Sequence, residues 1–384
     1  MTNTTVFPQV ATTFKGLEKV LSDELNALGA KNVQIANRAV EYEGDQELLY
    51  RANYYLRTAL KILKPIHFDR IRNEKQLYKS IYKIKWSDYL RLDQSFAIES
   101  VVHSPHFSHS KYAALKAKDA LVDQFRDRYG KRPDVDRDKP DLRVHIHISN
   151  ERLNVSLDSS GDPLFKRGYR KRTGSAPLNE VLAAGMIMLS GWDGKSVFID
   201  PMCGSGTIPI EAALIAHGIP AGKFRKFFGF QKWADYKPGI FNSIKSEYPV
   251  EINSKSLVYA ADIDEKAVQI ARENIRNAGL GRMIKTQVGS FEDLEISWKD
   301  PGIIMMNPPY GERLVPEDLR KLYGEIGTVL KHKYQGFTAW ILTSNLKGTK
   351  AIGLRPGSKM ELYNGPLECR FMKFDLFKGK LKQQ

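Results

Sequence analysis

"VFIDPMCGSGTIPIEAA", residues 197–213, indicates the fold of the second half of this chain. A short apolar run ends at Asp200, glycines follow at positions 204 and 206, and an apolar helical pattern begins at Thr207. Glycine allows the backbone to turn sharply and to approach a ligand closely. Thr207 is placed to cap the helix, and Pro209 suits its first turn. The segment therefore predicts a buried strand, a tight turn through Gly204 and Gly206, and a helix that presents free N–H groups.

The residue types of this turn limit the ligand it can hold. A dinucleotide fingerprint needs a third glycine where Pro209 stands, and a P-loop needs a Lys-Ser or Lys-Thr pair that is missing here. An acid precedes the turn, and the residues that would bind a phosphate are missing, so the turn favours a ligand with a cationic amine. A turn that binds no ligand is the alternative. Asp262 ends the next strand pattern, where an acid can accept bonds from two ribose hydroxyls. Asp264 is interpreted as the N-cap of the following helix.

Strand and helix patterns alternate through the rest of this half. This alternation predicts a parallel sheet built of βαβ units, a doubly wound α/β fold. The final stretch, residues 367–377, is expected to fold back as an antiparallel edge strand. The expected helices cover 179–191, 207–218, 265–279 and 316–333, and the expected strands cover 196–200, 256–262, 285–290, 302–307 and 337–344.

The first part of the chain has a different pattern. Short strands at 94–102 and 142–149 are mixed with amphipathic helices at 16–29, 47–63 and 110–129. This mixture predicts an α+β domain. Residues 156–175 are rich in Gly, Pro, Ser and positive charge, which is typical of a linker. We therefore predict an N-terminal region over 1–155, a basic linker over 156–175 and a second domain over 176–384.

Composition restricts the class of protein. The 384 residues include 59 Lys and Arg against 44 Asp and Glu, a net charge of +15, which favours a polyanionic partner such as nucleic acid. A basic protein kept soluble by its charge is the alternative. Two cysteines exclude a disulfide framework and a Cys-rich zinc site, and they suit a reducing cytosol. The apolar runs are too short to span a bilayer, and the N-terminus lacks the pattern of a signal peptide. A cytoplasmic protein with no membrane partner is expected.

A second motif, "MMNPPYGERL" at 305–314, follows a predicted buried strand. Asn307 then lies at the carboxyl edge of the sheet, where open α/β folds bind ligands. Its side-chain oxygen can accept one N–H of an exocyclic amine, and the carbonyl of Pro308, whose direction is fixed by the proline rings, can accept the other. Tyr310 can stack on a flat base. A rigid turn without function is the alternative.

This arrangement suits methyl transfer to a nucleobase amine. The amine is a weak nucleophile because its lone pair is delocalised into the ring. Two acceptors placed around the nitrogen draw the lone pair out of conjugation and direct it at an electrophilic methyl group. A base inside a duplex cannot reach such a pocket, so the target is flipped out or single-stranded.

The motifs "DPMCGSGTIPIEAA", "AADID" and "NPPYGERL" resemble those of class I S-adenosylmethionine-dependent methyltransferases that act on exocyclic amines. The stretches "HSKYAALKAKDALVDQF" and "RPDVD" resemble a THUMP domain, and the basic linker resembles the junction between the two modules. The resemblance covers nearly the whole chain and is close to bacterial enzymes that methylate guanine N2 in 23S rRNA. It implies a ferredoxin-like and THUMP region that binds structured RNA, followed by a Rossmann-like methyltransferase domain. Members of this branch often carry a label as DNA adenine-N6 methylases.

The resemblance also implies roles for single residues. The methionine end of S-adenosylmethionine would lie against Asp200, Gly204 and Gly206, and Asp262 would hold its ribose. The target base would be held by Asn307, Pro308 and Tyr310, with Asn307 also counted among the residues that line the cofactor. Many relatives have an acid after the third strand that contacts the adenine amine. Ser290 stands there in this chain, so either Ser290 or a neighbour such as Glu292 is expected to make that contact.

Three other stretches leave alternatives open. The basic stretch Lys166–Arg172, "KRGYRKR", fits either a solvated loop or a clamp for phosphates. The aromatic residues of the insertion at 223–239 are interpreted as packing, with base stacking as the alternative. The evenly spaced histidines 103, 106 and 109 lie in a loop and are interpreted as surface residues. No metal requirement is expected.

The sequence therefore predicts an enzyme that methylates guanine N2 in RNA, most favourably 23S rRNA, with S-adenosylmethionine as cofactor. The alternatives are a DNA adenine-N6 methyltransferase, a tRNA guanine-N2 methyltransferase and a catalytically silent RNA-binding assembly factor. The oligomeric state stays open.

Overall fold

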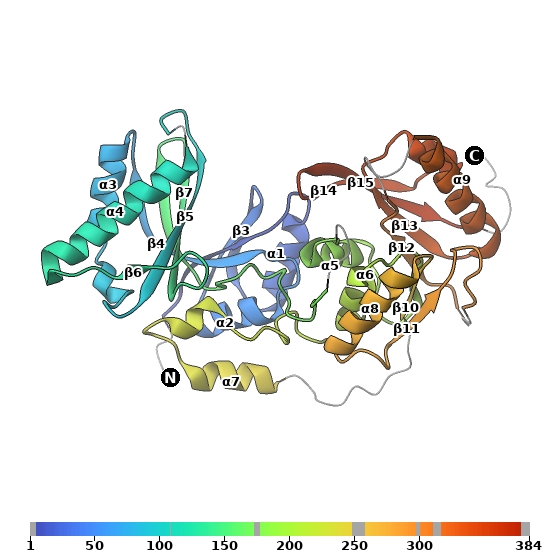
Figure 1. Ribbon diagram of the computed structural model, residues 1–384, viewed down its shortest axis with the longest axis horizontal. Helices are drawn as coiled ribbons and strands as arrows, with labels where there is room; N and C mark the ends of the chain where they lie inside the picture. The colour runs from blue at the N-terminus through green and yellow to red at the C-terminus, as the bar shows by residue number, and fades with distance from the viewer. Residues whose placement is uncertain are drawn as a thin grey trace. The chain divides into compact units, whose positions relative to one another are not determined.

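A computed structural model describes the fold over residues 5–107, 109–172, 177–247, 258–296, 300–309 and 316–377. The chain forms two compact units, each built around its own sheet (Figure 1). The first unit comprises Met1–Thr13, Ser22–Leu164 and Lys226–Glu247, and the second comprises Phe14–Leu21, Phe165–Arg225 and Tyr248–Gln384. Helix α1 (Glu18–Ala27) contributes to both units because the division falls inside it. The expected division into a region over 1–155, a linker over 156–175 and a domain over 176–384 stays a prediction.

The first unit contains an eight-stranded mixed sheet in the order β2-β3-β1-β4-β8-β7-β5-β6. Strand β5 pairs in parallel with β6 and β7, and the other neighbours are antiparallel. Helices α3 and α4 lie side by side next to this sheet (Figure 1). The bounds are β1 Phe7–Thr12, β2 Lys31–Ala36, β3 Ala39–Gly44, β4 Lys61–Arg70, β5 Ser95–His103, β6 Asp134–Val135, β7 Leu142–Ser149, β8 Arg152–Asp158, α2 Gln46–Tyr55, α3 Glu74–Lys83, α4 Ser110–Tyr129 and α7 Pro238–Ser246, with short 3-10 turns at Trp86–Asp88 and Gly229–Lys232.

One predicted helix of this unit is wrong in its second half. The expected helix over 47–63 ends as α2 at Tyr55, where Leu56 adopts extended backbone. Strand β4 begins six residues later and pairs with β1 on one side and β8 on the other. Apolar residues at 60–63 fit a helix or a buried strand equally well in sequence, and pairing on both sides of β4 decides for the strand.

The aromatic part of the insertion belongs to the first unit and packs inside it. Phe228 and Phe230 are buried, and the Phe230 ring stacks on Tyr50 of α2 with 4.3 Å between ring centroids. Trp233 is also buried, whereas Phe227 is 39% exposed. The packing interpretation is therefore confirmed for three of the four rings. Their partners belong to the first unit, although the insertion follows a strand and helix of the second.

Ion pairs connect three strands of the first unit near His145, and of their two acids Asp158 is buried and Glu99 is partly exposed. Lys61 on β4 contacts Glu99 on β5 at 2.7 Å and Asp158 on β8 at 3.0 Å. Burial, followed by the positive charge of Lys61, lowers the pKa of His145 on β7 to about 4. The imidazole is therefore neutral in the folded unit and gains a proton on unfolding once the pH falls below its ordinary value of about 6.5.

Acidification is expected to destabilise the first unit through His145. Stability from the neutral imidazole is fully present above about pH 6.5 and is lost as the pH falls towards 4. The His145→Gln variant should lose less stability between pH 7 and pH 5 than the parent protein, by on the order of 1–2 kcal/mol. Denaturant unfolding at both pH values measures this, with the exposed His106→Gln as control. Equal losses in the parent and the His145 variant would contradict the assignment.

The second unit contains the predicted parallel sheet. Its seven strands follow the order β11-β10-β9-β12-β13-β15-β14, and the five strands from β11 to β13 are parallel. The central strand β9 lies between β10 and β12, so the chain reverses its direction of winding there, which confirms the doubly wound class. The bounds are β9 Phe198–Asp200, β10 Val258–Asp262, β11 Ile284–Val288, β12 Ile303–Met306, β13 Thr338–Thr343, β14 Ser358–Asn364, β15 Leu367–Asp375, α5 Glu180–Leu189, α6 Thr207–Ala216, α8 Glu265–Asn277 and α9 Pro316–Lys333, with a 3-10 turn at Gly348–Ile352.

Helix α9 covers one face of this sheet (Figure 1). Its inner stripe, Leu319, Tyr323, Ile326 and Leu330, has helical spacing and is buried with Ile304 of β12 and other strand residues. The two central strands β9 and β12 are buried along their whole length. The sheet therefore gives the residues at its strand ends a rigid base.

The C-terminal strand is antiparallel, as expected, but its predicted edge position is wrong. Strand β15 pairs with β13 on one side and with β14 on the other, so β14 forms the edge. Phe371 and Phe374 of β15 are buried, which an edge position would not require. The preceding stretch 358–364 shows little apolar character and became a strand through its hairpin with β15.

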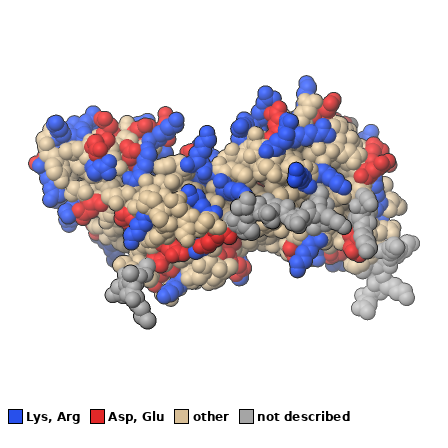
Figure 2. Space-filling model, turned by 90° about the horizontal axis from the view of Figure 1, so that it is seen from below, with Lys and Arg blue, Asp and Glu red and all other residues tan. Residues whose placement is uncertain are grey.

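Lysine and arginine side chains are distributed over the surface of both units. Figure 2 shows them on the visible face of each unit with aspartate and glutamate side chains between them. Within the described part of the chain, no helix is long and apolar enough to cross a membrane. Among the same residues, no group of three or more His, Cys, Asp and Glu side chains is arranged to hold a metal ion.

Candidate functional site

Three of the predicted site residues lie at the carboxyl ends of neighbouring strands. Asp200 is the last residue of β9, Asp262 is the last residue of β10, and Asn307 directly follows β12. These strands are parallel and adjacent, in the order β10-β9-β12. Their carboxyl ends therefore meet at one edge of the sheet, at the point where the winding reverses and ligands bind in open α/β folds.

The glycine-rich turn is held against β10. The Gly204 N–H donates to Asp262 Oδ2 at 2.9 Å, and the Cys203 N–H donates to the Ala261 carbonyl at 2.8 Å. Gly204 and Gly206 have φ angles of +53° and +85°, which favour glycine. A Cβ on Gly206 would also lie 3.1 Å from Cβ of Ala271 on α8. Both glycines are therefore required by the shape of the turn.

The predicted cap of the next helix is wrong. Gly206, in left-handed conformation, occupies the N-cap position of α6, and Thr207 is the first helical residue. The Thr207 hydroxyl accepts a hydrogen bond from Arg170 Nη2 at 2.8 Å. The Thr207 hydroxyl, which the local sequence pattern assigned to the helix N-terminus, is therefore bound by Arg170, a residue distant in sequence.

Asp200 carries a buried oxygen that the described residues leave unpaired. The side chain is 1% exposed, and Oδ1 accepts from the Met202 N–H at 3.2 Å. Oδ2 has no hydrogen-bond partner among the described residues. Burial, reinforced by the negative charge of Asp262, raises the pKa of Asp200 well above its usual range. An unpaired buried carboxylate is costly in free energy, and a ligand ammonium would relieve that cost.

Asp262 is arranged by the backbone around it. Its Oδ1 accepts from the Asp264 N–H at 3.0 Å and its Oδ2 from Gly204, so both oxygens are fixed at the end of β10. Asp264 caps α8 as predicted, because its side chain accepts from the Lys266 N–H at 2.9 Å. Ile263, between the two acids, is 75% exposed. The exposed side chain of Ile263 at this strand end was not predicted from the sequence. The sequence indicates it only by placing an apolar residue between two acids, in "DID".

Ser290 lies just beyond the end of β11. Its hydroxyl donates to Asp293 Oδ2 at 2.6 Å and accepts from the Asp293 N–H at 3.2 Å. The Gly289 N–H donates to the Asp262 carbonyl at 3.0 Å, which ties this loop to β10. Ser290 therefore holds a carboxylate, Asp293, beside the end of the third strand. The expected contact from Ser290 or Glu292 to a cofactor stays a prediction.

Asn307 is the second site residue with a buried atom that the described residues leave without a hydrogen bond. Its Oδ1 is buried and has no hydrogen-bond partner among the described residues. Pro308 is also buried, and Pro309 is exposed. Tyr310 lies outside the described residues, so its predicted stacking role stays a prediction. The amide oxygen and the proline that follows it can serve as a fixed acceptor pair.

A separate cavity lies beside the outer strands. It has a volume of about 460 Å³ and is lined by residues of β10 and β11, by Ile199 of β9, by Gly281 and by the segment 294–296. None of the predicted site residues that the structure describes lines it. The predicted site is therefore defined by the strand ends and the glycine-rich turn.

A class I methyltransferase fold accounts for these features: a doubly wound sheet, a glycine-rich turn after the central strand, and acids and an Asn-Pro-Pro segment at the strand ends. Comparison with known families gives the same class. The RMKL-like methyltransferase domain matches residues 167–373, the THUMP domain matches 72–158, and the RlmL ferredoxin-like domain matches 9–63. The chain belongs to the THUMP-containing RMKL-like RNA methyltransferases. The predicted family, fold class and type of enzyme are confirmed at this level.

Two relatives illustrate the range of the family. The chain is 37% identical over 376 residues to slr0064 of Synechocystis sp., provisionally named an RNA methyltransferase, covering 97% of this chain and 98% of that protein. It is 36% identical over 378 residues to the ribosomal RNA large subunit methyltransferase K/L of Syntrophotalea carbinolica, covering 95% of this chain and 53% of that protein. The chain spans about half the length of the K/L relatives it matches.

Solved structures share the fold. SMU.472, provisionally named a methyltransferase and crystallised with SAH, matches with a TM-score of 0.85 and 28% identity over 98% of this chain and 99% of that one. A Listeria monocytogenes protein, described as a predicted N6-adenine-specific DNA methylase, matches with a TM-score of 0.85 and 29% identity over 97% of each chain.

Proposed function

We propose that this protein transfers a methyl group from S-adenosylmethionine to the exocyclic N2 amine of a guanine in RNA, and that 23S rRNA is its substrate. The observation that carries this proposal is the buried Oδ1 of Asn307 at the switch point of the sheet, which has no hydrogen-bond partner among the described residues; the same holds for Oδ2 of Asp200 at the end of the neighbouring strand β9. The amide oxygen of Asn307 suits the neutral amine of a base, and the carboxylate oxygen of Asp200 suits the cationic amine of the methyl donor. A cytoplasmic location forms part of the same proposal.

The cofactor prediction, S-adenosylmethionine, is confirmed by the methyltransferase family and by the SAH-bound neighbour. The residues present fit this group. Asp200 would bind the ammonium of the methionine moiety, and the turn at Gly204 and Gly206 would lie against the same moiety. Asp262 would accept hydrogen bonds from the ribose hydroxyls. The exposed Ile263 would lie against the flat adenine, and Ser290 with Asp293 would accept from its amine.

The chain's own residues then activate the target. When bound, S-adenosylmethionine supplies an electrophilic methyl group. Asn307 Oδ1 and the Pro308 carbonyl accept the two N–H groups of the amine and turn its lone pair towards that methyl group. The N–C bond forms as the C–S bond breaks, which leaves S-adenosylhomocysteine. The extra proton on the nitrogen passes to solvent, so no strong protein base is required.

The choice of guanine in RNA has separate support. The THUMP domain over 72–158 belongs to RNA-binding modules, and the K/L relatives are named for large-subunit ribosomal RNA. The chain's excess of 15 positive charges suits a phosphate backbone. The name of the Listeria neighbour favours adenine N6 in DNA as the second candidate. An Asn-Pro-Pro segment can hold either amine.

The test is to delete the gene and compare the methylated nucleotides of rRNA, tRNA and DNA by mass spectrometry. Loss of one N2-methylguanosine from 23S rRNA is expected. Purified protein with S-adenosylmethionine should restore it on rRNA from the deletion strain, and the Asn307→Ala variant should not. A methyl group lost from DNA adenine, or only from tRNA, would overturn the substrate assignment. Unchanged methylation with a persistent assembly defect would favour the silent assembly factor.

A further inference from the structure

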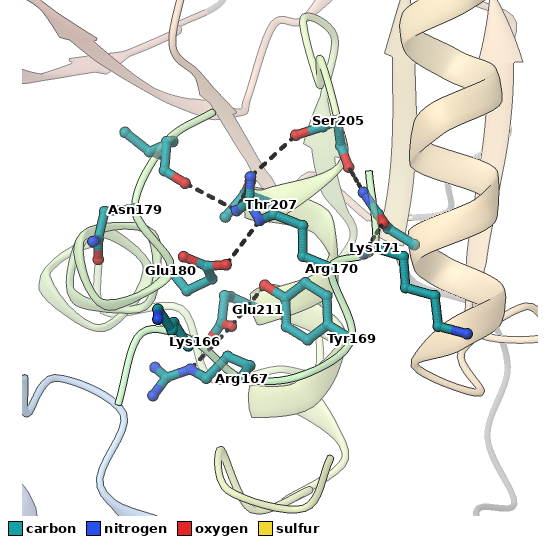
Figure 3. Close-up of polar contacts among 12 residues, drawn as sticks. Lys166, Arg167, Tyr169, Arg170, Lys171, Asn179, Glu180, Ser205, Thr207 and Glu211 are labelled. Atoms are coloured by element: carbon teal, nitrogen blue, oxygen red, sulfur yellow. Dashed lines mark hydrogen bonds and ion pairs between the residues drawn. The ribbon is translucent and has the colours of Figure 1, made fainter. Parts of the chain in front are cut away.

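The basic stretch Lys166–Arg172 turns its side chains in two directions. Arg167 and Tyr169 are buried, and the Arg170 side chain is 12% exposed, whereas Lys171 and Arg172 are exposed. Figure 3 shows Arg170 among residues of the glycine-rich turn, with the Lys171 side chain directed away from them. The alternatives of a solvated loop or a phosphate clamp therefore do not describe the buried half of the stretch.

Arg170 uses all three guanidinium nitrogens on groups of the second unit (Figure 3). Nε donates to Glu180 Oε1 at 2.8 Å, and Nη2 donates to the Leu178 carbonyl at 3.1 Å and to Thr207 Oγ1 at 2.8 Å. Nη1 donates to Ser205 Oγ at 3.4 Å. Ser205 and Thr207 flank Gly206, so one planar side chain holds both sides of the turn. A guanidinium has the fixed fork of donors that this needs, and a lysine ammonium does not.

Neighbouring residues fix the same segment from other directions. Asn274 of α8 donates from Nδ2 to the Ser205 carbonyl at 3.0 Å and to the Arg172 carbonyl at 3.2 Å. The Tyr169 hydroxyl donates to Glu211 Oε1 at 3.0 Å, one turn along α6. Glu180, the acid that receives Nε, is the first residue of α5. Arg170 Nε lies 2.8 Å from Glu180 Oε1, and this contact orients the guanidinium. Burial raises the pKa of Glu180, and the charge of Arg170 opposes that rise.

We propose that Arg170 is a positioning residue for the methyl donor: held by Glu180, it fixes the turn at Ser205–Thr207 in the shape that binds S-adenosylmethionine. It does not touch the cofactor in this account and acts through the turn. The proposal rests on the proposed use of this turn for the cofactor. Residues Arg170, Glu180 and Thr207 therefore form a clasp, the Arg170 clasp, which acts on cofactor binding and leaves RNA binding unaffected.

The first test is the Arg170→Lys variant, which keeps the charge and loses the fork. The Kd for S-adenosylhomocysteine by calorimetry and the KM for S-adenosylmethionine are expected to rise about 10- to 100-fold, as for the loss of charge-assisted hydrogen bonds. The kcat at saturating cofactor and the Kd for rRNA should stay within about twofold. The matched control is Lys171→Met, the adjacent exposed lysine, which should leave cofactor affinity unchanged.

The Thr207→Val variant is a second test of the clasp, for the case that Arg170→Lys does not fold. It removes one acceptor of Arg170 without changing side-chain volume much, and it should raise the Kd for S-adenosylhomocysteine by a smaller factor. The double variant with Arg170→Lys should bind no worse than Arg170→Lys alone, because the two groups act together. If Arg170→Lys does not fold, a Thr207→Val protein with unchanged cofactor affinity overturns the proposal.

The outcomes separate this proposal from the proposed function. A parent protein that binds no S-adenosylhomocysteine would reject the cofactor site itself. A parent protein that binds it, with an Arg170→Lys variant that binds it equally well, would reject the clasp alone. Reduced RNA affinity with unchanged cofactor affinity in Arg170→Lys would also reject the clasp and would restore the phosphate-clamp interpretation.

Discussion

Replacing Asn307 by alanine is expected to reduce kcat by about 100- to 1000-fold, the range for loss of one preorganised polar group that acts in the transition state. The physical reason is the position of Oδ1: it is buried, follows β12 directly and has no hydrogen-bond partner among the described residues. An acceptor that the described residues leave without a hydrogen bond is available to the substrate amine. Single-turnover methylation of rRNA from the deletion strain measures the effect.

The Asn307→Asp variant is the matched comparison. It keeps an oxygen of similar position and should retain a measurable part of the activity that alanine loses. S-adenosylhomocysteine affinity should change by no more than about threefold in either variant, because the amide acts mainly on the amine. Full activity in Asn307→Ala would reject the mechanism. A large loss of cofactor affinity with unchanged kcat would place Asn307 in the cofactor site only.

Replacing Asp200 by asparagine is expected to have effects of opposite sign on stability and on cofactor binding. Burial raises the pKa of Asp200 well above its usual range, so ionisation of this carboxyl in the unfolded chain opposes folding of the cofactor-free protein. That penalty is absent below the unfolded pKa, grows as the pH rises from the unfolded to the folded pKa, and is constant above the folded pKa. Asparagine removes it, and the cofactor-free variant should show a higher Tm near pH 7 than the parent protein.

Cofactor binding should change the other way. The ammonium of the cofactor needs an anionic partner, and loss of a buried charged partner is expected to weaken S-adenosylhomocysteine binding about 100-fold or more. In the parent protein, affinity should increase with pH as Asp200 ionises, with protons released on binding. In Asp200→Asn this pH dependence should be reduced. Calorimetry in two buffers of different ionisation enthalpy measures the affinity and the number of protons released on binding. A variant that binds as tightly as the parent would contradict the assigned role.

Much of the candidate site could be predicted because each of its parts is local in sequence. Asp200, Gly204 and Gly206 lie within seven residues, and glycine at positive φ is the ordinary solution for a strand that turns into a helix at once. Asp262 ends one strand of a βαβ unit, and Asn307 directly follows another. Parallel strands have their carboxyl ends at the same edge, so the sequence also indicated that these residues would meet.

Other predictions failed where groups distant in sequence decided the outcome. Thr207 was expected to cap its own helix, and its hydroxyl instead pairs with Arg170, 37 residues earlier. The tail strand was placed at the edge, and β14 took that position by pairing with β15. The stretch 60–63, with three apolar residues, fitted a helix in sequence, but it pairs with β1 on one side and β8 on the other.

The sequence by itself determined the parallel sheet, the glycine-rich turn and the residues at its strand ends. Local backbone conformation follows from neighbouring residues, and alternating strands and helices imply parallel strands. Only the tertiary structure decided which charges of Lys166–Arg172 face inward, and that the aromatic insertion packs beside Tyr50. A basic or aromatic side chain is equally compatible with solvent and with a buried partner. Whether such a side chain is buried depends on whether a segment distant in sequence places a carboxylate, a hydroxyl or a ring beside it. The local sequence pattern does not contain that information.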